Sequence, residues 1–320
     1  MTGVPRTDRL ALAAAAVTVL LWASAFVGIR AAAEDLTAGP LALGRLLVAS
    51  LVLTLVVLWR GEAGLPERRD LPAVALCGVV WFGLYNVALN QGERSVDAGT
   101  AAMLVNLGPL LIALLAGAVL GEGFPRALLL GCAVAFAGTV VIGAGSTASR
   151  HADLAGVALC VGAAVAYAVG VTLQKPLLAR TSALRITWLA CLTGTVVLLP
   201  FSAVLVRETG DADAGALAWT VYLGIFPTAV AFTTWAFALG RTTAGRMGAT
   251  TYLVPPLAVL LGWLLLDEVP ATIALAGGAL CLAGVALARR GSGPPAAAGT
   301  AAAATSPVAA ARSAPPAASR

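Results

Sequence analysis

The stretch AGTAAMLVNLGPLLIALLAGAVLGE at residues 98–122 returns in outline as AGRMGATTYLVPPLAVLLGWLLLDE at residues 244–268. Both stretches begin with Ala-Gly and end with Leu, one further residue and Glu, and Pro109 falls on Pro255. Residue 98 thus matches residue 244, an offset of 146 positions. Pro, Glu and several Gly positions that match at one offset indicate an internal repeat, because chance pairing among the abundant Ala, Gly and Leu residues would not align Pro with Pro and Glu with Glu as well. Further matches are Gly131 with Gly277, Gly138 with Gly284 and, at a shift of 145, Trp22 with Tyr167.

The composition around this repeat is that of a polytopic membrane protein. Of the 320 residues, 60% are hydrophobic and only 11% are charged, against about 25% charged in an ordinary soluble domain. A soluble chain of this length cannot bury so much apolar surface. The net charge of +5 comes from basic residues scattered over short loops, and therefore does not indicate a nucleic-acid partner.

Ten apolar stretches are long enough to cross a bilayer, which takes about 20 mostly apolar residues. The sequence therefore predicts an all-α polytopic membrane protein with ten transmembrane helices. The predicted spans are residues 10–29, 39–59, 71–91, 98–120, 126–145, 154–174, 184–206, 215–238, 243–266 and 270–288.

The repeat divides these spans into two halves of five. Because five is odd, the second half enters the membrane from the opposite side, which is the inverted-topology repeat of many secondary transporters. We therefore predict a cytoplasmic N-terminus at residues 1–9, a first five-helix repeat at 10–145 and a second at 154–288. The first stretch could also be read as a cleavable signal peptide, but its counterpart in the second repeat favours a retained helix. Residues 291–320, rich in Ala, Pro and Gly, are predicted to be a disordered cytoplasmic tail.

The loop charges predict the orientation. With a cytoplasmic N-terminus, the outer loops carry Arg30, Arg94, Arg150 and Arg207, and Arg45 falls within a span. This asymmetry predicts that both termini are cytoplasmic in the cell inner (plasma) membrane. The basic residues on the predicted inner side are Arg6, Arg9, Arg60, Arg68, Arg69, Arg126, Lys175, Arg180, Arg185, Arg241, Arg246, Arg289 and Arg290.

The sequence offers little for enzymatic chemistry. The five cysteines lie singly in apolar runs and are read as small apolar fillers. The one histidine, His151, lies in a loop, and no phosphate-binding GxxxxGK[ST] motif is present. We therefore predict no catalytic residue, no metal site and no cofactor. An intramembrane lipid-modifying enzyme would need an acid, histidine or metal cluster at the membrane face, so that alternative is disfavoured.

Each half resembles an EamA-type domain of the drug/metabolite transporter superfamily. The resemblance rests on Leu21-Trp22-Ala23-Ser24-Ala25-Phe26-Val27, on Arg45-Leu46-Leu47 and on the two stretches quoted above. It also rests on Gly224-Ile225-Phe226-Pro227-Thr228 and Trp235 in the second half. It implies a ten-helix transporter, usually an exporter of small metabolites such as amino acids or drug-like compounds. It names no single substrate.

Polar and aromatic residues within the spans are the candidates for substrate binding, because buried polar groups in a bilayer need partners or water. Asn106 and Tyr252 occupy equivalent places next to helix-breaking prolines, and Asn86 and Asn90 lie four residues apart on one helix face. At a mid-membrane break, freed backbone groups can face a cavity. The further candidates are Trp22, Tyr167, Thr228, Trp235 and Arg45.

Several questions stay open at the level of sequence. Arg45 is read either as a binding charge for an anionic or zwitterionic substrate or as a structural arginine, and the resemblance, which carries arginine here over different substrates, favours the second. Glu122 and Glu268 are read either as proton carriers or as carboxylates that cap or orient the next helix in the chain, and their peripheral places favour the second. The expected partners are a small-molecule substrate and the lipid bilayer. A coupling proton, an oligomeric assembly and a facilitative channel or uniporter are left open.

Overall fold

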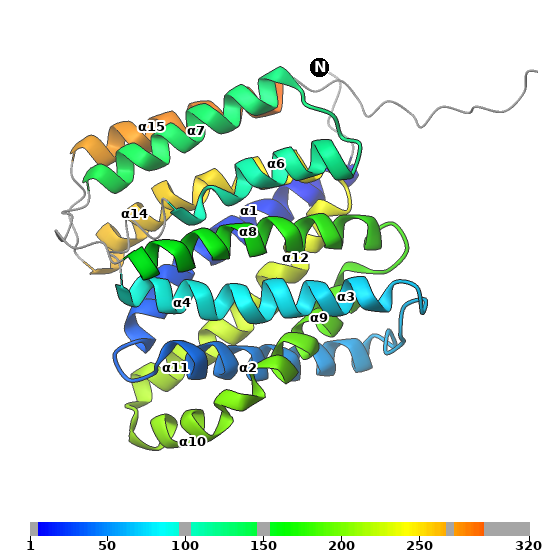
Figure 1. Ribbon diagram of the computed structural model, residues 1–320, viewed down its shortest axis with the longest axis vertical. Helices are drawn as coiled ribbons and strands as arrows, with labels where there is room; N and C mark the ends of the chain where they lie inside the picture. The colour runs from blue at the N-terminus through cyan, green and yellow to red at the C-terminus, as the bar shows by residue number, and fades with distance from the viewer. Residues whose placement is uncertain (1–5, 96–103, 146–153, 267–271, 291–320) are drawn as a thin grey trace, which may run out of the picture.

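The computed structural model describes residues 6–95, 104–145, 154–266 and 272–290, and all regular structure in these ranges is helical. Figure 1 shows the helices stacked side by side, with α7 and α15 at one end of the longest axis and α10 at the other. The elements of the first half are α1 (Arg6–Ala32), α2 (Ala38–Trp59), α3 (Leu71–Cys77), η1 (Gly78–Leu84), α4 (Tyr85–Ser95), α6 (Gly108–Val119) and α7 (Arg126–Gly145). Those of the second half are α8 (Leu154–Leu177), α9 (Ala183–Leu198), η2 (Leu199–Phe201), α10 (Ser202–Asp211), α11 (Ala214–Leu223), η3 (Gly224–Val230), α12 (Ala231–Leu239), α13 (Ala244–Thr250), η4 (Thr251–Leu253), α14 (Val254–Leu266) and α15 (Thr272–Arg290).

Within the described residues the predicted spans coincide with these helices, and several spans are built from consecutive helical pieces; residues 98–103 of the fourth span and 270–271 of the tenth lie outside the described residues. The third span is α3, η1 and α4, the eighth is α11, η3 and α12, and the ninth is α13, η4 and α14. Within the described residues, six continuous helical stretches are long and apolar enough to cross a membrane. In hydrocarbon a helix satisfies every backbone group within one segment, which explains why apolar runs of this length adopt it.

The two halves are inverted repeats, and contacts between equivalent helices demonstrate it. In α7 and α15 a Cβ built on Gly138 would lie 2.6 Å from the Gly277 oxygen, and one on Gly284 would lie 2.6 Å from the Gly131 oxygen. Because 131 matches 277 and 138 matches 284, the equivalent helices pack against each other in antiparallel directions (Figure 1). Helices related by a two-fold axis in the membrane plane must run this way.

The second and seventh spans, α2 and α9, are also equivalent in the repeat and also pack against each other. The hydroxyls of Ser50 and Thr195, which are 145 positions apart, lie 2.8 Å from each other. Further along α2, Thr54 accepts a hydrogen bond from the Trp188 indole at 2.8 Å. Contact therefore moves backward along α9 as it moves forward along α2, so this pair is antiparallel too.

Departures from α-helix also repeat between the halves. The π-helices η1 and η3 begin at Gly78 and Gly224, which the 146-residue offset superimposes. The 3₁₀ turn η4 falls on residues 105–107, where the fourth span is also interrupted by a turn before α6. Pro227 accounts for part of η3, because proline cannot donate a helix hydrogen bond. The sequence predicted the breaks near Pro109 and Pro255 but not the π-helix η1, which contains no proline.

The cysteine interpretation is confirmed, since all five side chains are buried and unbridged. Among the described residues no group of three or more His, Cys, Asp or Glu side chains is placed to hold a metal ion. The predicted tail at 291–320, most of the N-terminal segment and the predicted cap Glu268 lie outside the described residues.

Candidate functional site

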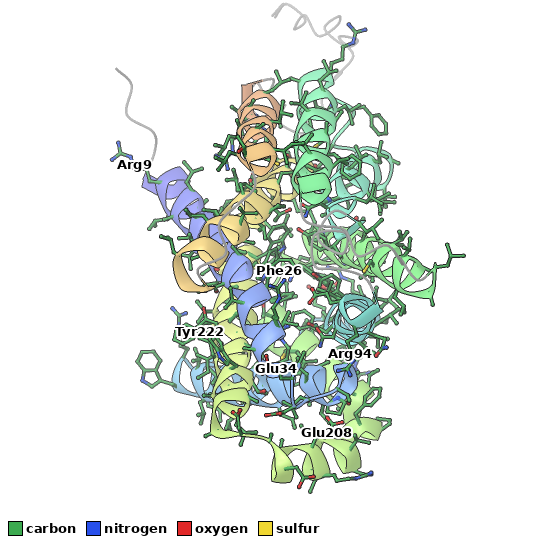
Figure 2. All side chains as sticks on the ribbon, turned by 90° about the vertical axis from the view of Figure 1, so that its left-hand side faces the viewer. Arg9, Phe26, Glu34, Arg94, Glu208 and Tyr222 are labelled. Carbon is green, nitrogen blue, oxygen red and sulfur yellow. The ribbon has the colours of Figure 1, made fainter. Side chains whose placement is uncertain are left out.

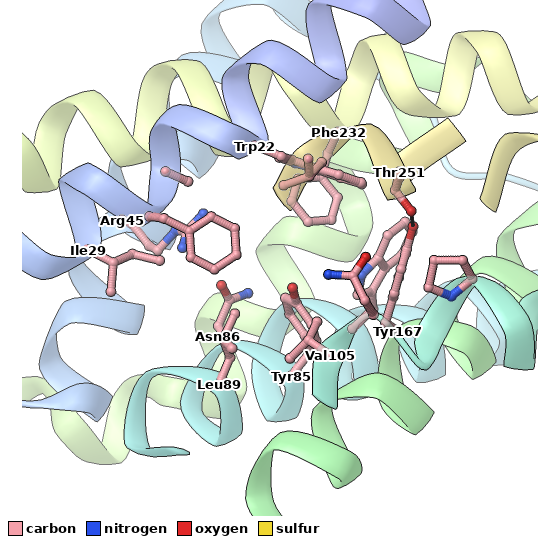
Figure 3. A pocket seen from close by; sticks show the side chains of 16 residues that line it. Trp22, Ile29, Arg45, Tyr85, Asn86, Leu89, Val105, Tyr167, Phe232 and Thr251 are labelled. Atoms are coloured by element: carbon pink, nitrogen blue, oxygen red, sulfur yellow. Dashed lines mark hydrogen bonds between the residues drawn. The ribbon is translucent and has the colours of Figure 1, made fainter. Parts of the chain in front are cut away.

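A cavity lies between the two halves, where the helix breaks meet. Its volume is about 80 Å³, which is room for roughly five to eight water molecules. Figure 3 shows Arg45 and Asn86 at the end near Ile29, and Tyr167 and Thr251 at the other end. The first half contributes residues from α1, α2, η1, α4 and α6, and the second half from α8, α12, η4 and α14.

Six of the cavity-lining residues form three equivalent pairs. Val105 and Thr251 are 146 positions apart and both line the cavity. Asn86 and Phe232 form a second pair at the same offset, and Trp22 and Tyr167 form a third at 145. The rings of that third pair touch, with centroids 6.1 Å apart in an edge-to-face arrangement. The cavity therefore lies on the axis that relates the repeats.

Aromatic rings form a large part of its wall. Trp81, carried by η1, lies 5.5 Å from Tyr167 and 5.0 Å from Phe232 between ring centroids. Trp22 lies 5.4 Å from Phe232 and donates its indole hydrogen to the Pro227 carbonyl at 3.2 Å. Such a wall is rigid and apolar, and it excludes water from the polar groups between the rings.

Trp235 belongs to this aromatic cluster but stands behind the lining. It is fully buried, its ring centroid lies 5.0 Å from that of Trp22, and its indole nitrogen has no hydrogen-bond partner among the described residues. Its contribution is to hold Trp22 in place.

Arg45 is the charged group of the cavity wall. It is only 5% exposed, and its Nε donates to the Thr228 hydroxyl at 3.0 Å. Thr228 in turn donates to the Leu223 carbonyl five residues earlier at 2.7 Å, a reach that the π-helix η3 makes possible. The two terminal amines of Arg45 have no hydrogen-bond partner among the described residues. The side chain is thus both fixed at Nε and able to bind an anion with its outer amines.

The three predicted asparagines lie in two different cavities. Asn86 lines the cavity, points toward Arg45 (Figure 3) and donates its amide to the Phe82 carbonyl at 2.8 Å. Asn106 lines it at the break of the fourth span. Asn90, one turn beyond Asn86, lies instead in a second cavity and donates to the Ala38 carbonyl at 3.2 Å.

The structure does not bring Tyr252 to the cavity. Its ring is fully buried in a separate cluster with Ala113, Leu128, Cys132 and Val285. The neighbouring Thr251 faces the cavity and accepts a hydrogen bond from the Tyr167 hydroxyl at 3.5 Å. The 3₁₀ turn rotates the chain at this point, so periodicity could not decide which of the two faces inward.

The second cavity, which we call the vestibule, adjoins the first at one end. It measures about 310 Å³ and shares Phe26 and Ile29 with the central cavity. Its other walls come from the end of α1, the start of α2 and the end of α4. Figure 2 labels Phe26, Glu34 and Arg94 on this side of the molecule.

The opposite end of the molecule is closed by polar contacts between helix ends. Lys175, at the end of α8, donates to the carbonyls of Leu239, at 2.7 Å, and Thr242. Arg180 and Asp70 form a bidentate pair at 2.6 and 3.1 Å. Under the repeat Lys175 matches Arg30, and Leu239 matches Glu93. The ends of α1 and α4 line the vestibule. Their repeat equivalents, the ends of α8 and α12, are joined to each other on the opposite side of the molecule.

Glu122 belongs to this closed end. Its two carboxylate oxygens accept from the Ala244 and Gly245 amides at 2.6 and 3.1 Å. The capping interpretation is therefore confirmed, but the capped helix is α13 of the second half and not the next helix in the chain.

Sequence reasoning did not single out Phe26, Trp81, Phe232 or Thr251 as cavity residues. Phe232 could have been found as the repeat equivalent of the predicted Asn86, and Thr251 as the neighbour of the predicted Tyr252. Trp81 carried no signal, because its place depends on η1.

Comparison with known proteins agrees with this architecture. A family model described as "EamA-like transporter family" matches residues 9–144 and 154–290. A "Probable terminal-alkyne amino-acid exporter" of Streptantibioticus cattleyicolor is 41% identical over 276 residues, covering 86% of this chain and 91% of the relative. A "Probable amino-acid metabolite efflux pump" of Escherichia coli is 24% identical over 213 residues, covering 64% and 70%.

A solved crystal structure whose description names no function has the same fold. It superposes with a TM-score of 0.73 at 20% identity and covers 89% of this chain and 98% of its own. Together with the two family matches, which cover both repeats, the inverted architecture leads to one conclusion: this chain is a multi-pass membrane transporter that belongs to the EamA-like transporter family.

Proposed function

We propose that the protein is a secondary transporter that exports small metabolites, amino acids or drug-like compounds, by alternating access. The observation that carries this proposal is the asymmetry between equivalent helix ends. At one end of the central cavity, the ends of α1 and α4 line the open vestibule. At the other end, Lys175 joins the equivalent ends of α8 and α12. Inverted repeats that exchange these two arrangements would open the cavity first to one side and then to the other.

A buried glutamine supports such an exchange. Gln174, next to Lys175, is fully buried, and neither its side-chain amide nitrogen nor its side-chain oxygen has a hydrogen-bond partner in the part of the chain that the structure describes. Each unsatisfied group costs about 1–3 kcal/mol. Opening of this end would hydrate both atoms and relieve the cost.

The loop charges give the direction. With both termini cytoplasmic in the plasma membrane, the vestibule faces outward, and the contacts of Lys175 and Glu122 close the cytoplasmic end. The described conformation is then the one that releases an exported substrate. The proposed function needs no cofactor.

The cavity is suited to a small molecule with an anionic group and an apolar part. Among the described residues the two terminal amines of Arg45 have no hydrogen-bond partner, the aromatic rings offer apolar surface, and the polar side chains of Asn86 and Asn106 line the cavity. The names of the relatives from S. cattleyicolor and E. coli, which mention amino acids, support this substrate class.

Reconstitution in liposomes tests the proposal. Vesicles containing the purified protein are given a panel of radiolabelled amino acids and cationic drugs, with and without a pH gradient. We expect saturable uptake that accelerates when unlabelled substrate is present on the opposite side. A channel would give flux without this acceleration, and no transport of any compound would reject the function.

A facilitative uniporter is the second candidate. No Asp or Glu is among the described residues that line the central cavity, so the cavity itself offers no proton-carrying group. In the liposome assay a uniporter would show the acceleration but no dependence on the pH gradient.

A further inference from the structure

Two hydrogen-bond acceptors lie beside the anion-binding end of the central cavity. Asn86 is 2% exposed, and its side-chain nitrogen donates to the Phe82 carbonyl at 2.8 Å. Because a carbonyl can only accept, this bond fixes which end of the amide is nitrogen and leaves Oδ1 for the cavity. Tyr85, the preceding residue, also lines the cavity. Neither Oδ1 of Asn86 nor the Tyr85 hydroxyl has a hydrogen-bond partner in the part of the chain that the structure describes.

These acceptors lie at the same end of the cavity as the guanidinium group of Arg45. Figure 3 shows Asn86 and Arg45 pointing toward each other, with Tyr85 next to Asn86 on α4. Tyr85 and Arg45 are also close enough to interact electrostatically. In an α-amino acid the carboxylate carbon and the ammonium nitrogen are only about 2.5 Å apart. A carboxylate held by the outer amines of Arg45 therefore brings its ammonium group to this end of the cavity.

Comparison of the repeats indicates that the fold does not require polar side chains at these places. The equivalents of Arg45, Tyr85 and Asn86 in the second half, at offsets of 145, 146 and 146, are Ala190, Ala231 and Phe232. All three equivalents are apolar and buried. The polar group of three in the first half therefore has a purpose other than packing of the repeats. It also gives the cavity one polar end, so that a ligand with a polar head binds in a single orientation.

The two acceptors are suited to a group that donates hydrogen bonds. An ammonium group has three donors and no acceptor, and it is costly inside a membrane unless it finds partners. No Asp or Glu is among the described residues that line this cavity. The positive charge is therefore compensated by the substrate's own carboxylate and by neutral oxygen atoms. A substrate with a hydrogen atom in place of the ammonium group would leave both oxygen atoms without a partner, which lowers affinity.

We propose that Oδ1 of Asn86 and the Tyr85 hydroxyl bind the ammonium group of an α-amino acid whose carboxylate is held by Arg45. This inference rests on the proposed function and narrows its substrates to zwitterionic α-amino acids. The side chain of the substrate then extends along the aromatic rings toward Tyr167 and Thr251 at the other end of the cavity. Tyr85 and Asn86 determine specificity, because they distinguish an amino acid from a carboxylate of the same shape without the amino group.

Two compounds with the same carbon skeleton test this assignment. L-valine carries both charges, and 3-methylbutanoate is the same molecule without the ammonium group. Affinities are measured by titration calorimetry on the full chain in lipid nanodiscs, for the unmutated protein and for Tyr85→Phe, Asn86→Leu and Arg45→Gln. Tyr222→Phe is the matched control, because it removes a hydroxyl that bonds to Ser24 at 2.6 Å and belongs to no residue of the cavity lining.

We expect the unmutated protein to bind valine at least about 10-fold more tightly than 3-methylbutanoate. Tyr85→Phe and Asn86→Leu should each weaken valine by about 10- to 100-fold, the range for a hydrogen bond to a charged group. Neither variant should weaken 3-methylbutanoate, and this retained binding also shows that both are folded. Arg45→Gln should weaken both compounds by a similar factor, and Tyr222→Phe should change neither.

The subsite is overturned if the unmutated protein binds the two compounds equally well, or if neither acceptor variant loses affinity for valine. Equal loss of both compounds in Tyr85→Phe and Asn86→Leu would also overturn it, because these residues would then only maintain the shape of the cavity. If neither compound binds while liposomes show transport of another class of compound, the subsite is rejected and the transport function stands. Absence of both binding and transport would reject the proposed function itself.

Discussion

At the scale of single residues, Arg45 combines the two roles that the sequence presented as alternatives. Its Nε is fixed by Thr228, as in a structural arginine, and its outer amines face the cavity, as in a binding residue. The link between the two roles is the hydroxyl of Thr228, which is itself held by the π-helix.

Thr228→Val removes that hydroxyl with little change in shape. The loss of one hydrogen bond, worth about 0.5–1.5 kcal/mol, should weaken binding of a carboxylate-bearing substrate roughly 2- to 12-fold, because the guanidinium is no longer held in position. Thr220→Val is the matched control, since that buried hydroxyl bonds only within its own helix, to Ala216. Equal affinities of the two variants in a calorimetric titration would contradict the positioning role.

Asn106 and Tyr252 are equivalent in the repeat but differ in surroundings, and their variants should differ accordingly. Asn106→Ala should lower substrate affinity about 2- to 12-fold at unchanged yield, because it removes a polar group from the cavity wall. Tyr252→Ala should instead lower the melting temperature, since emptying a buried aromatic site costs about 3–5 kcal/mol. Substrate affinity and melting temperature are measured on both variants. A Tyr252→Ala protein with normal stability and reduced affinity would show that Tyr252 belongs to the binding site and not to the packing core.

At the scale of elements, the sequence predicted the spans, the repeat and the breaks beside the prolines, because each leaves a local composition signal. It could not predict η1, since a shift from i→i+4 to i→i+5 bonding needs no particular residue. For the same reason it could not predict that Trp81 enters the cavity. Among its candidates, Asn86, Asn106, Trp22, Tyr167 and Arg45 line the cavity. Tyr252 and Trp235 do not, because the rotation of a 3₁₀ turn and the depth of packing decide where they point, and the sequence shows neither.

The α7–α15 pair depends on glycine at its crossing points. Gly138→Ala would place a Cβ 2.6 Å from the Gly277 oxygen, a contact that real Cβ atoms do not make. The two helices must then separate, at a cost of about 1–3 kcal/mol, and we expect a lower melting temperature in detergent. Gly162→Ala in α8 is the control, because nothing lies within 4 Å of the new methyl group. The close-packing account fails if the two variants melt at the same temperature.

At the scale of the whole molecule, the orientation determines which side the vestibule serves. In a variant without native cysteines, a single cysteine at exposed Asp211, near the vestibule side, should react with an impermeant thiol reagent added to intact cells. One at exposed Glu67, in the loop between α2 and α3, should be protected. Labelling of the Glu67 position from outside, without that of Asp211, would invert the topology and with it the proposed direction of release.

The central claim is that the two halves exchange arrangements about their common axis. Spin labels at Glu34 and Arg94 report the width of the vestibule, and labels at their repeat equivalents, Ala179 and Gly240, report the closed end. Electron–electron distance measurements on both pairs, in lipid and with a transported substrate, test the claim most directly. The account predicts a second population in which the first distance is shorter and the second is longer by a similar amount. If either distance stays fixed, or if both lengthen together, the protein does not work by alternating access.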